Sequence, residues 1–288
     1  MRVGWLGLGA MGGPMAARVA QAGHPVHGYD VVPGRAQSLD GVSPAATAGA
    51  AASGADAVVA MVATPDQLAE ALFGAAGAAG ALAAGTVVVI MATVGPEAAV
   101  SAATRLAAQD VPVVDAPVSG GTARAAAGDL LIMASGAAAA LERVRPLLDV
   151  LAGKAPVVGH SPGDGQRMKL VNQLLCGVHI AAAAEALAFA ESLGLAAADC
   201  WEVLQDGAAA SFMFGDRGAR MIAGGFGHPR SALDIFVKDM GLVTAAAAQA
   251  GAPVPLAAAA RDLYDDGHDR GLGRLDDSAV IEVLRARR

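Results

Sequence analysis

The first half of the chain alternates short apolar runs with longer segments rich in alanine. The apolar runs predict buried strands, and the segments between them predict helices. We expect strands at 2–6, 25–30, 56–62, 86–91, 111–115 and 129–135, and helices at 11–22, 66–73, 96–109 and 137–152. Strands separated by helices at this spacing are typical of βαβ units, which build a doubly wound, mostly parallel α/β sheet.

The second half lacks this alternation and has the pattern of helices throughout. A breaker cluster at 162–165 precedes a stretch over 166–193 that contains no proline and only one glycine, Gly177. This stretch is apolar nearly all round, which predicts one long buried helix of roughly 42 Å. Shorter helices are expected at 197–205, 214–222, 235–250, 255–266 and 277–287. We therefore predict an α/β domain over 1–161 and an all-helical domain over 162–288, built on the long helix.

Composition excludes several functional classes. A content of 55% hydrophobic and 16% charged residues excludes disorder as the main state. The net charge of −7, without a block of Lys or Arg, argues against nucleic-acid binding. The N-terminus lacks the shape of a signal peptide, and no uninterrupted run is long enough for a membrane span. Two cysteines and six histidines without ligand spacing predict no metal site, and we expect a cytoplasmic protein.

A dinucleotide fingerprint follows the first expected strand. The run Gly7-Leu8-Gly9-Ala10-Met11-Gly12 has the spacing G-x-G-x-x-G and opens the helix at 11–22. In this context the first glycine makes a tight turn, the second lets the backbone approach a pyrophosphate, and the third lets helix and strand pack closely. A plain glycine-rich turn is the alternative interpretation. The predicted cofactor-binding residues of this run are Gly7, Leu8, Gly9, Ala10, Met11 and Gly12.

Asp30 ends the second expected strand, 18 residues after Gly12. A carboxylate at this place binds the 2′-hydroxyl of the adenosine ribose. The same charge repels the 2′-phosphate of NADP, although Arg35 would offset part of that repulsion. We therefore expect NAD rather than NADP as the cofactor.

A second candidate motif follows the strand expected at 111–115. The run from Asp115 to Gly121 lies at the carboxyl edge of the predicted sheet, where ligands bind in open α/β folds. Ser119 offers a hydroxyl, and Gly120 and Gly121 offer backbone N–H groups without a Cβ in the way. We expect these three residues to hold a substrate carboxylate. A tight turn after the strand is the alternative.

Lysine is rare in this chain, with three lysines against seventeen arginines. Of the two, only lysine readily loses its proton when desolvated. Lys169, at the start of the long apolar helix, is therefore a candidate general acid and base. Asn172 lies on the same helix face, one turn further on. A purely structural lysine is the alternative, and Lys238 either reaches the cofactor or pairs with Asp239.

Four motifs in this order resemble the β-hydroxyacid dehydrogenase family. They are 7–12 with Pro14-Met15, 115–130, 163–172 and Lys238-Asp239, and the resemblance extends through 276–281. The family includes 3-hydroxyisobutyrate dehydrogenase and tartronate semialdehyde reductase. Membership implies a Rossmann domain followed by an all-helical domain, an NAD-dependent oxidation of a small hydroxy acid, and a homo-oligomer, either dimer or tetramer.

The resemblance also implies roles for individual residues. It makes Lys169 the catalytic residue and places Asn172 with the Ser119-Gly120-Gly121 run around the substrate. Residues implied near the nicotinamide are Val62, Ala63, Thr93 and Lys238, and Lys238 is also a candidate substrate contact. The stretch Val62-Ala63-Thr64-Pro65 departs from the Leu-Pro that the family often carries.

Two further runs, 210–214 and 229–243, resemble the L-threonate dehydrogenase branch of this family, which oxidises a four-carbon sugar acid at C2. A polar set at or near motif positions fits such a substrate: Ser119, Asn172, Ser211, Asp234 and Lys238. The alternative is that both runs only pack helices, with Phe212, Phe214, Phe236 and Val237 in the core.

Several other activities stay open at this point. Within the family, the substrate alternatives are 3-hydroxyisobutyrate, glycerate and tartronate semialdehyde. An imine reductase usually replaces the lysine, so Lys169 argues against one. A non-catalytic dinucleotide sensor would have no need for Lys169, Asn172 and Ser119 together.

Overall fold

The computed structural model describes residues 1–287, so Arg288, the last residue of the predicted second domain, lies outside the described residues. The chain forms two compact units, Met1–Lys169 and Leu170–Arg288. The predicted boundary at 161 precedes helix α7 (Asp164–Ser192), whereas the division between the units falls inside α7.

Unit 1 contains an eight-stranded sheet in the order β11-β9-β6-β5-β4-β1-β2-β3. All neighbouring pairs are parallel except β6–β9, which is antiparallel. The sheet is therefore mostly parallel, as predicted. The strands are β1 (Val3–Leu6), β2 (Val26–Tyr29), β3 (Val42–Pro44), β4 (Ala57–Ala60), β5 (Val87–Ile90), β6 (Val113–Asp115), β9 (Ala134–Ser135) and β11 (Val157–Gly159). A small second sheet has the order β10-β8-β7, with β7 (Val118–Ser119), β8 (Leu130–Ile132) and β10 (Ala152–Lys154).

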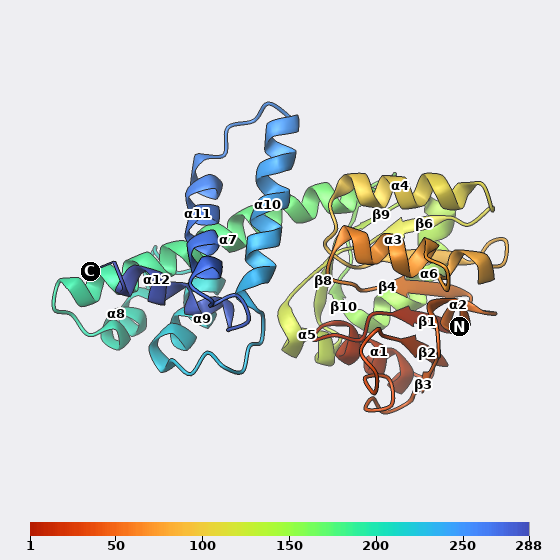
Figure 1. The fold of residues 1–288 in the computed structure, drawn as a ribbon, viewed down its shortest axis with the longest axis horizontal. Coiled ribbons are helices and arrows are strands. Elements are labelled where there is room, and N and C mark those ends of the chain that lie inside the picture. Colours follow the sequence, from red (N-terminus) through yellow and green to blue (C-terminus); the bar gives the residue numbers. More distant parts are fainter. Residues whose placement is uncertain (288) are drawn as a thin grey trace. The chain divides into compact units, whose positions relative to one another are not determined.

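Helices cover both faces of the large sheet. They are α1 (Gly12–Gln21), α2 (Ala48–Ala52), α3 (Pro65–Phe73), α4 (Pro96–Ala107), α5 (Gly121–Ala127), α6 (Ala138–Leu151) and the 3₁₀ turn η1 (Ala79–Ala81). Alternate residues of β5 belong to two separate cores, because successive side chains of a strand point to opposite faces. Val87 and Val89 pack with α1 and α6, whereas Val88 and Ile90 pack with α3 and α4. Figure 1 shows α3 and α4 side by side on their face of the sheet.

Several short elements of unit 1 are absent from the sequence expectations. The predicted strand at 129–135 is divided between the two sheets as β8 and β9. Strands β3 and β10 carry mostly exposed residues, so they leave no apolar run to detect. Helix α5 begins at Gly121, with a φ of +77°, and ends at the left-handed Gly128, so the sequence around it reads as a turn.

Unit 2 is all helical, as predicted. Its elements after α7 are α8 (Ala197–Leu204), α9 (Phe212–Ala223), α10 (Leu233–Gln249), α11 (Pro255–Asp269), the 3₁₀ turn η2 (Asp277–Val280) and α12 (Ile281–Arg285). The predicted helix at 277–287 is therefore two pieces, η2 and α12. Figure 1 shows α10 and α11 as a pair.

Helices α7, α10 and α11 meet at Gly177. A Cβ at this position would collide with the Met240 side chain of α10, so glycine permits the close packing. The Tyr264 hydroxyl of α11 donates a 2.8 Å hydrogen bond to the Gly177 carbonyl. Burial raises the pKa of Tyr264 well above its ordinary value, which keeps this hydroxyl a donor.

Helix α7 is the one helix among residues 1–287 whose length and composition would suffice to cross a membrane. Half of its most apolar window is buried inside the protein. The core helix of a folded domain passes the same test, and α7 has core residues such as Ile180 and Leu187.

A buried ion network anchors η2 to α9. Arg220 donates to both carboxylate oxygens of Asp276 at 2.9 and 2.7 Å, and Arg217 does the same to Asp277 at 3.1 and 2.9 Å. Burial alone would raise the pKa of Asp276. Hydrogen bonds from Ser278 and from the Arg230 amide, together with the Arg220 charge, outweigh burial and hold this pKa below its ordinary value.

We predict that Asp276→Asn lowers the free energy of unfolding by at least about 1.5 kcal/mol at neutral pH, because bonds to a charged group are lost in a buried place. The depressed pKa means that this contribution is present above the ordinary carboxyl pKa and disappears as the pH falls through the lower native value. Urea unfolding of parent and variant at several pH values should therefore give curves that converge in acid. Glu142→Gln, which breaks an exposed pair with Arg145, is the control and should cost about 0–1 kcal/mol. A constant difference at every pH would contradict the assignment.

Candidate active site

Three glycines of the fingerprint loop have different surroundings. Gly7 has a φ of +94°, and a Cβ there would collide with the Met61 carbonyl. A Cβ at Gly12 would collide with the Gly7 carbonyl. In contrast, a Cβ at Gly9 would meet only the Arg35 guanidinium, at 3.8 Å. The protein's own packing thus requires Gly7 and Gly12, whereas Gly9 leaves open space of the kind that a bound pyrophosphate needs.

Asp30 lies directly after β2 and is tied to the fingerprint loop. Its carboxylate accepts hydrogen bonds from the Leu8 amide at 2.6 Å and the Val32 amide at 2.8 Å. Arg35 contacts the same carboxylate at 3.1 Å. These bonds hold the Asp30 carboxylate beside the glycine loop, and Arg35 forms an ion pair with that carboxylate.

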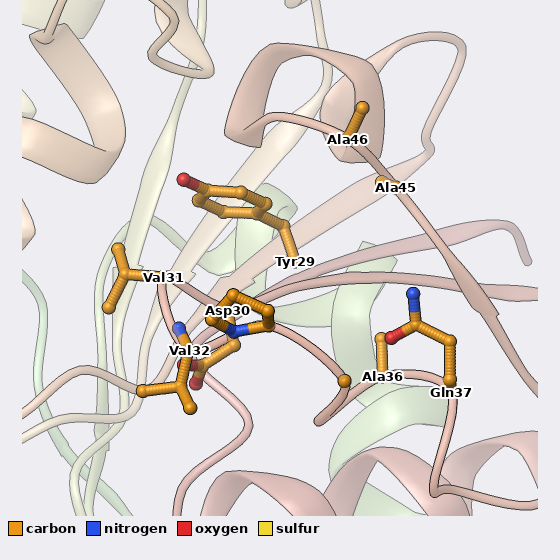
Figure 2. A pocket seen from close by; sticks show the side chains of 10 residues that line it. Tyr29, Asp30, Val31, Val32, Ala36, Gln37, Ala45 and Ala46 are labelled. Carbon is orange, nitrogen blue, oxygen red and sulfur yellow. Dashed lines mark hydrogen bonds between the residues drawn. The ribbon is translucent and has the colours of Figure 1, made fainter.

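A pocket of about 290 Å³ lies next to Asp30. It is lined by Tyr29 and Asp30, by the loop that follows them, and by Ala45 and Ala46. Figure 2 shows Val31 and Val32 on one side of this pocket, with Ala36 and Gln37 on the other. A nucleoside-sized, partly apolar hollow beside a carboxylate fits the adenosine end of a dinucleotide.

The Val62-Ala63 stretch follows β4 and leads into α3. Thr64 caps that helix by accepting from the Gln67 amide at 3.1 Å. In return, the Gln67 side chain accepts from the Ala63 amide at 2.8 Å. In the stretch that departs from the family's Leu-Pro, the Ala63 amide therefore already donates a hydrogen bond within the protein.

Thr93 follows β5, and Asp115 ends β6. Because β1, β2, β4, β5 and β6 run parallel, the residues after each strand meet at one edge of the sheet. Unit 1 thus assembles the fingerprint loop, Asp30, the 62–63 stretch and Thr93 along this edge.

Asp115 is fully buried at the end of β6 and contacts the first turn of α7. It accepts from the amides of Gly163 and Gln166, each at 2.9 Å, and from the Gln166 side chain at 2.8 Å. Burial raises the pKa of Asp115, and these hydrogen bonds oppose the rise without cancelling it. Sequence reasoning missed Gln166, because it is one of several polar residues in the first turns of α7 and nothing in the sequence distinguishes it.

Ser119 and Lys169 also belong to unit 1. Ser119 lies in β7, opposite Leu131 of β8, and is followed by Gly120 and Gly121, whose φ values are +145° and +77°. Such backbone is strained for residues with a Cβ, so the two glycines are required for the turn as well as for any ligand contact. Lys169 is buried and lies in the second turn of α7, because that helix begins at Asp164 rather than at 166.

In unit 2, a hydrogen-bonded chain joins two of the predicted residues. Asn172 donates to the Gln173 side chain at 2.8 Å, and Gln173 donates to Asp239 in a short hydrogen bond. Asp239 lies 2.7 Å from the Lys238 ammonium. Of the two alternatives for Lys238, the pairing with Asp239 is present in the structure. Gln173, which links Asn172 to this pair, was not anticipated.

Two residues of the expected polar set have structural partners. Ser211 caps α9 by accepting from the Phe214 amide at 3.0 Å, and Asp234 lies 2.6 Å from His268. Of the aromatic residues nearby, Phe214 and Phe236 are buried, whereas Phe212 is 65% exposed. Helix packing therefore accounts for part of the 210–214 and 229–243 runs.

Metal binding has no support in the described part of the chain. Residues 1–287 contain no group of three His, Cys, Asp or Glu side chains able to hold an ion.

Two family models together match almost the whole chain. The NAD binding domain of 6-phosphogluconate dehydrogenase matches residues 2–159. The NAD-binding domain of NADP-dependent 3-hydroxyisobutyrate dehydrogenase matches residues 163–284. The first model alone spans more than half of the chain.

Comparisons with individual proteins indicate the same kind of enzyme, over nearly the full length of each chain. The chain is 41% identical to an L-threonate dehydrogenase of Pectobacterium atrosepticum, over 97% of this chain and 92% of that protein. It is 39% identical to the L-threonate dehydrogenase of Escherichia coli K12, over 98% and 94%. A crystal structure of 3-hydroxyisobutyrate dehydrogenase from Salmonella typhimurium superposes with a TM-score of 0.92 at 38% identity, over 98% of this chain and 99% of that one.

The parallel sheet with its fingerprint loop, the all-helical second unit and these matches agree with one another. The chain belongs to the β-hydroxyacid dehydrogenases of the 3-hydroxyisobutyrate dehydrogenase type, a family of NAD-dependent oxidoreductases.

Proposed function

We propose that this enzyme oxidises L-threonate, or a close four-carbon sugar acid, at C2 with NAD. The observation that carries the proposal is the identity of about 40% with proteins named L-threonate dehydrogenase, sustained over nearly the full length of both chains. The resemblance of the 210–214 and 229–243 runs to the same branch supports it.

We assign the cofactor to the sheet edge of unit 1. The open space at Gly9 suits a pyrophosphate within the Gly7–Gly12 loop, which includes Leu8, Ala10 and Met11. The pocket beside Asp30 suits the adenosine. Val62, Ala63 and Thr93 follow neighbouring strands and are proposed to lie along the nicotinamide, together with Lys238.

The residues of this chain would perform the remaining chemistry. Ser119 and the amides of Gly120 and Gly121 hold the substrate carboxylate, and Asn172 and Lys238 orient the rest of the substrate. Lys169, as a neutral amine, takes the proton of the hydroxyl group while the carbon that bears it loses a hydride. When bound, NAD supplies the acceptor for that hydride. In the reverse direction, the Lys169 ammonium returns the proton to the oxygen.

We also infer that the enzyme acts in the cytoplasm as a soluble homo-oligomer, a dimer or a tetramer. Unit 2 exposes several large apolar side chains, and a group of exposed apolar residues marks contact surfaces in soluble proteins. They are Phe189, Leu193, Leu195 and Val203.

A substrate screen tests the proposed reaction. We expect kcat/KM with NAD to be highest for L-threonate. In a second experiment, we expect the Lys169→Ala variant to lose about 10²–10⁴-fold in kcat while it still binds NADH. Steady-state NADH formation from L-threonate, glycerate and 3-hydroxyisobutyrate makes the comparison. A tenfold preference for either of the other acids, about 1.4 kcal/mol of transition-state free energy, would reassign the substrate but not the family. A Lys169→Ala variant that keeps more than about a tenth of kcat would remove Lys169 from its role.

The two roles of glycine in the fingerprint loop can be separated. Gly9→Ala should fold with an unchanged thermal midpoint but weaken NADH binding by at least about tenfold, because the new methyl group occupies ligand space. Gly12→Ala should lower the thermal midpoint, since its methyl group meets the Gly7 carbonyl. Thermal unfolding and fluorescence titration with NADH measure both effects. Equal affinity in Gly9→Ala and the parent would place the pyrophosphate elsewhere.

Cofactor preference is expected to depend on the Asp30–Arg35 pair. Asp30→Ala removes the charge that repels a 2′-phosphate and frees Arg35 to bind one, so the NAD-to-NADP ratio of kcat/KM should fall by at least about tenfold. The double variant Asp30→Ala/Arg35→Ala should regain part of that ratio, and Arg35→Ala alone serves as the control. An unchanged ratio in Asp30→Ala would show that this carboxylate does not face the ribose.

A further inference from the structure

Gln166 is a fully buried amide in the first turn of α7, and every hydrogen-bonding position of its side chain is used. Its oxygen accepts from the amides of Val94 at 3.0 Å and Gly95 at 3.1 Å. Its nitrogen donates to the Ala92 carbonyl at 3.0 Å and to Asp115 at 2.8 Å. All these partners lie within unit 1.

This arrangement accepts only one orientation of one side chain. Rotating the amide by 180° would set its N–H groups against two amide donors and its oxygen against two acceptors. A carboxylate in the same place would face the Ala92 carbonyl and the Asp115 carboxylate with an oxygen. Leaving a buried polar group unpaired costs about 1–3 kcal/mol, so the network holds its members in fixed positions.

Each of the three segments that Gln166 joins contains or adjoins proposed site residues. Residues 92–95 include Thr93. Asp115 precedes the run that ends in Ser119-Gly120-Gly121. Gln166 itself lies one helical turn before Lys169.

The same turn is fixed by two further contacts. The Gly165 amide donates to the Ser135 hydroxyl at 2.9 Å, and a Cβ at Gly165 would come within 2.6 Å of the Met133 carbonyl. The helix therefore begins in direct contact with the sheet, and Gln166 is the side chain that relates its position to the loop after β5.

We propose that Gln166 is a positioning residue for the reaction: through its four hydrogen bonds it sets Lys169 relative to Thr93 and the Ser119 run. The proposal rests on the function assigned above. The four side-chain hydrogen bonds of Gln166 go to Ala92, Val94, Gly95 and Asp115, and the residue acts by keeping the distances among the groups that react. Groups that act on a substrate must be held to within about 0.5 Å, so a loosened first turn of α7 lowers the rate of the chemical step.

The test compares Gln166→Met, which cannot make any of the four bonds, with Gln166→Glu, which keeps the two acceptor bonds and loses the two donor bonds. Thr86→Val is the matched control, because Thr86 donates a buried hydrogen bond to the Ala55 carbonyl at the opposite end of β5. All four proteins are compared in thermal midpoint, in kcat and KM for the hydroxy acid, and in NADH affinity.

Two further measurements separate positioning from mere stability. One is the primary deuterium isotope effect on kcat, with the substrate labelled at the carbon that loses the hydride. The other is hydrogen exchange of the Val94 and Gly95 amides, which donate to Gln166.

For both Gln166 variants we expect kcat to fall at least about tenfold, with KM changed less than about threefold and an isotope effect larger than that of the parent. Exchange at Val94 and Gly95 should accelerate, while the amides of β5 stay protected. Thr86→Val should lose thermal stability and keep kcat, KM and the isotope effect. Gln166→Glu keeps the size of the side chain, so it provides the answer if Gln166→Met does not fold.

A kcat within twofold of the parent in a folded Gln166 variant would overturn the proposal, as would an equal loss in Thr86→Val. These outcomes differ from failure of the proposed function. In that case the parent itself would oxidise no hydroxy acid, or Lys169→Ala would retain its activity.

Discussion

Asp115 places a carboxylate where water does not reach, and the bonds that compensate its burial organise unit 1. Two of its donors are the amides of Gly163 and Gln166, so the carboxylate determines where α7 starts. Its third donor, the Gln166 side chain, extends the same network to the loop after β5. An uncompensated charge at this depth would cost several kcal/mol, which makes the junction of sheet and helix a rigid one.

In the proposed reaction, the sheet edge and the helix supply different parts of the chemistry, so the rigidity of their junction bears on function. The edge gives ligand space at Gly9 and a fixed carboxylate at Asp30. The helix carries Lys169. A more stable sheet or a more stable helix would not by itself fix the distance between the Lys169 amine and the carboxyl edge of the sheet. The side-chain hydrogen bonds between α7 and the sheet fix that distance.

Much of this arrangement could be predicted from the sequence, and the reason is physical. Buried parallel strands such as Val87–Ile90 leave continuous apolar runs, and a glycine loop between strand and helix leaves a fixed spacing. The fold class and the fingerprint follow from those signals, whereas the family was identified from the resemblance of four motifs in order. Lys169 was found because lysine is rare in this chain, and Asp115 because it begins a run at the carboxyl end of an expected strand.

The strands and hydrogen bonds that were not predicted leave no local pattern in the sequence. The edge strands β3 and β10 expose most of their residues, so no period of two appears. Gln166 and Gln173 each form hydrogen bonds with residues more than sixty positions away in the sequence, and sequence spacing does not reveal such bonds. Ser211 and Asp234, which the sequence suggested as substrate contacts, also have structural partners that the sequence did not indicate. Ser211 caps a helix, and Asp234 contacts a histidine.

The chain Asn172–Gln173–Asp239–Lys238 has a consequence for how such an enzyme can change over evolutionary time. Asp239 is 1% exposed, and Lys238 is the cation beside it. A neutral residue at 238 would leave that buried charge with one partner fewer, and the loss would spread to the amide groups that orient Asn172. Under the proposed substrate role of Lys238, exchanging this residue alone is therefore a poor route to new substrates. The position is epistatic with 239 and 173, and divergence of this part of the protein should proceed through correlated replacements rather than single steps.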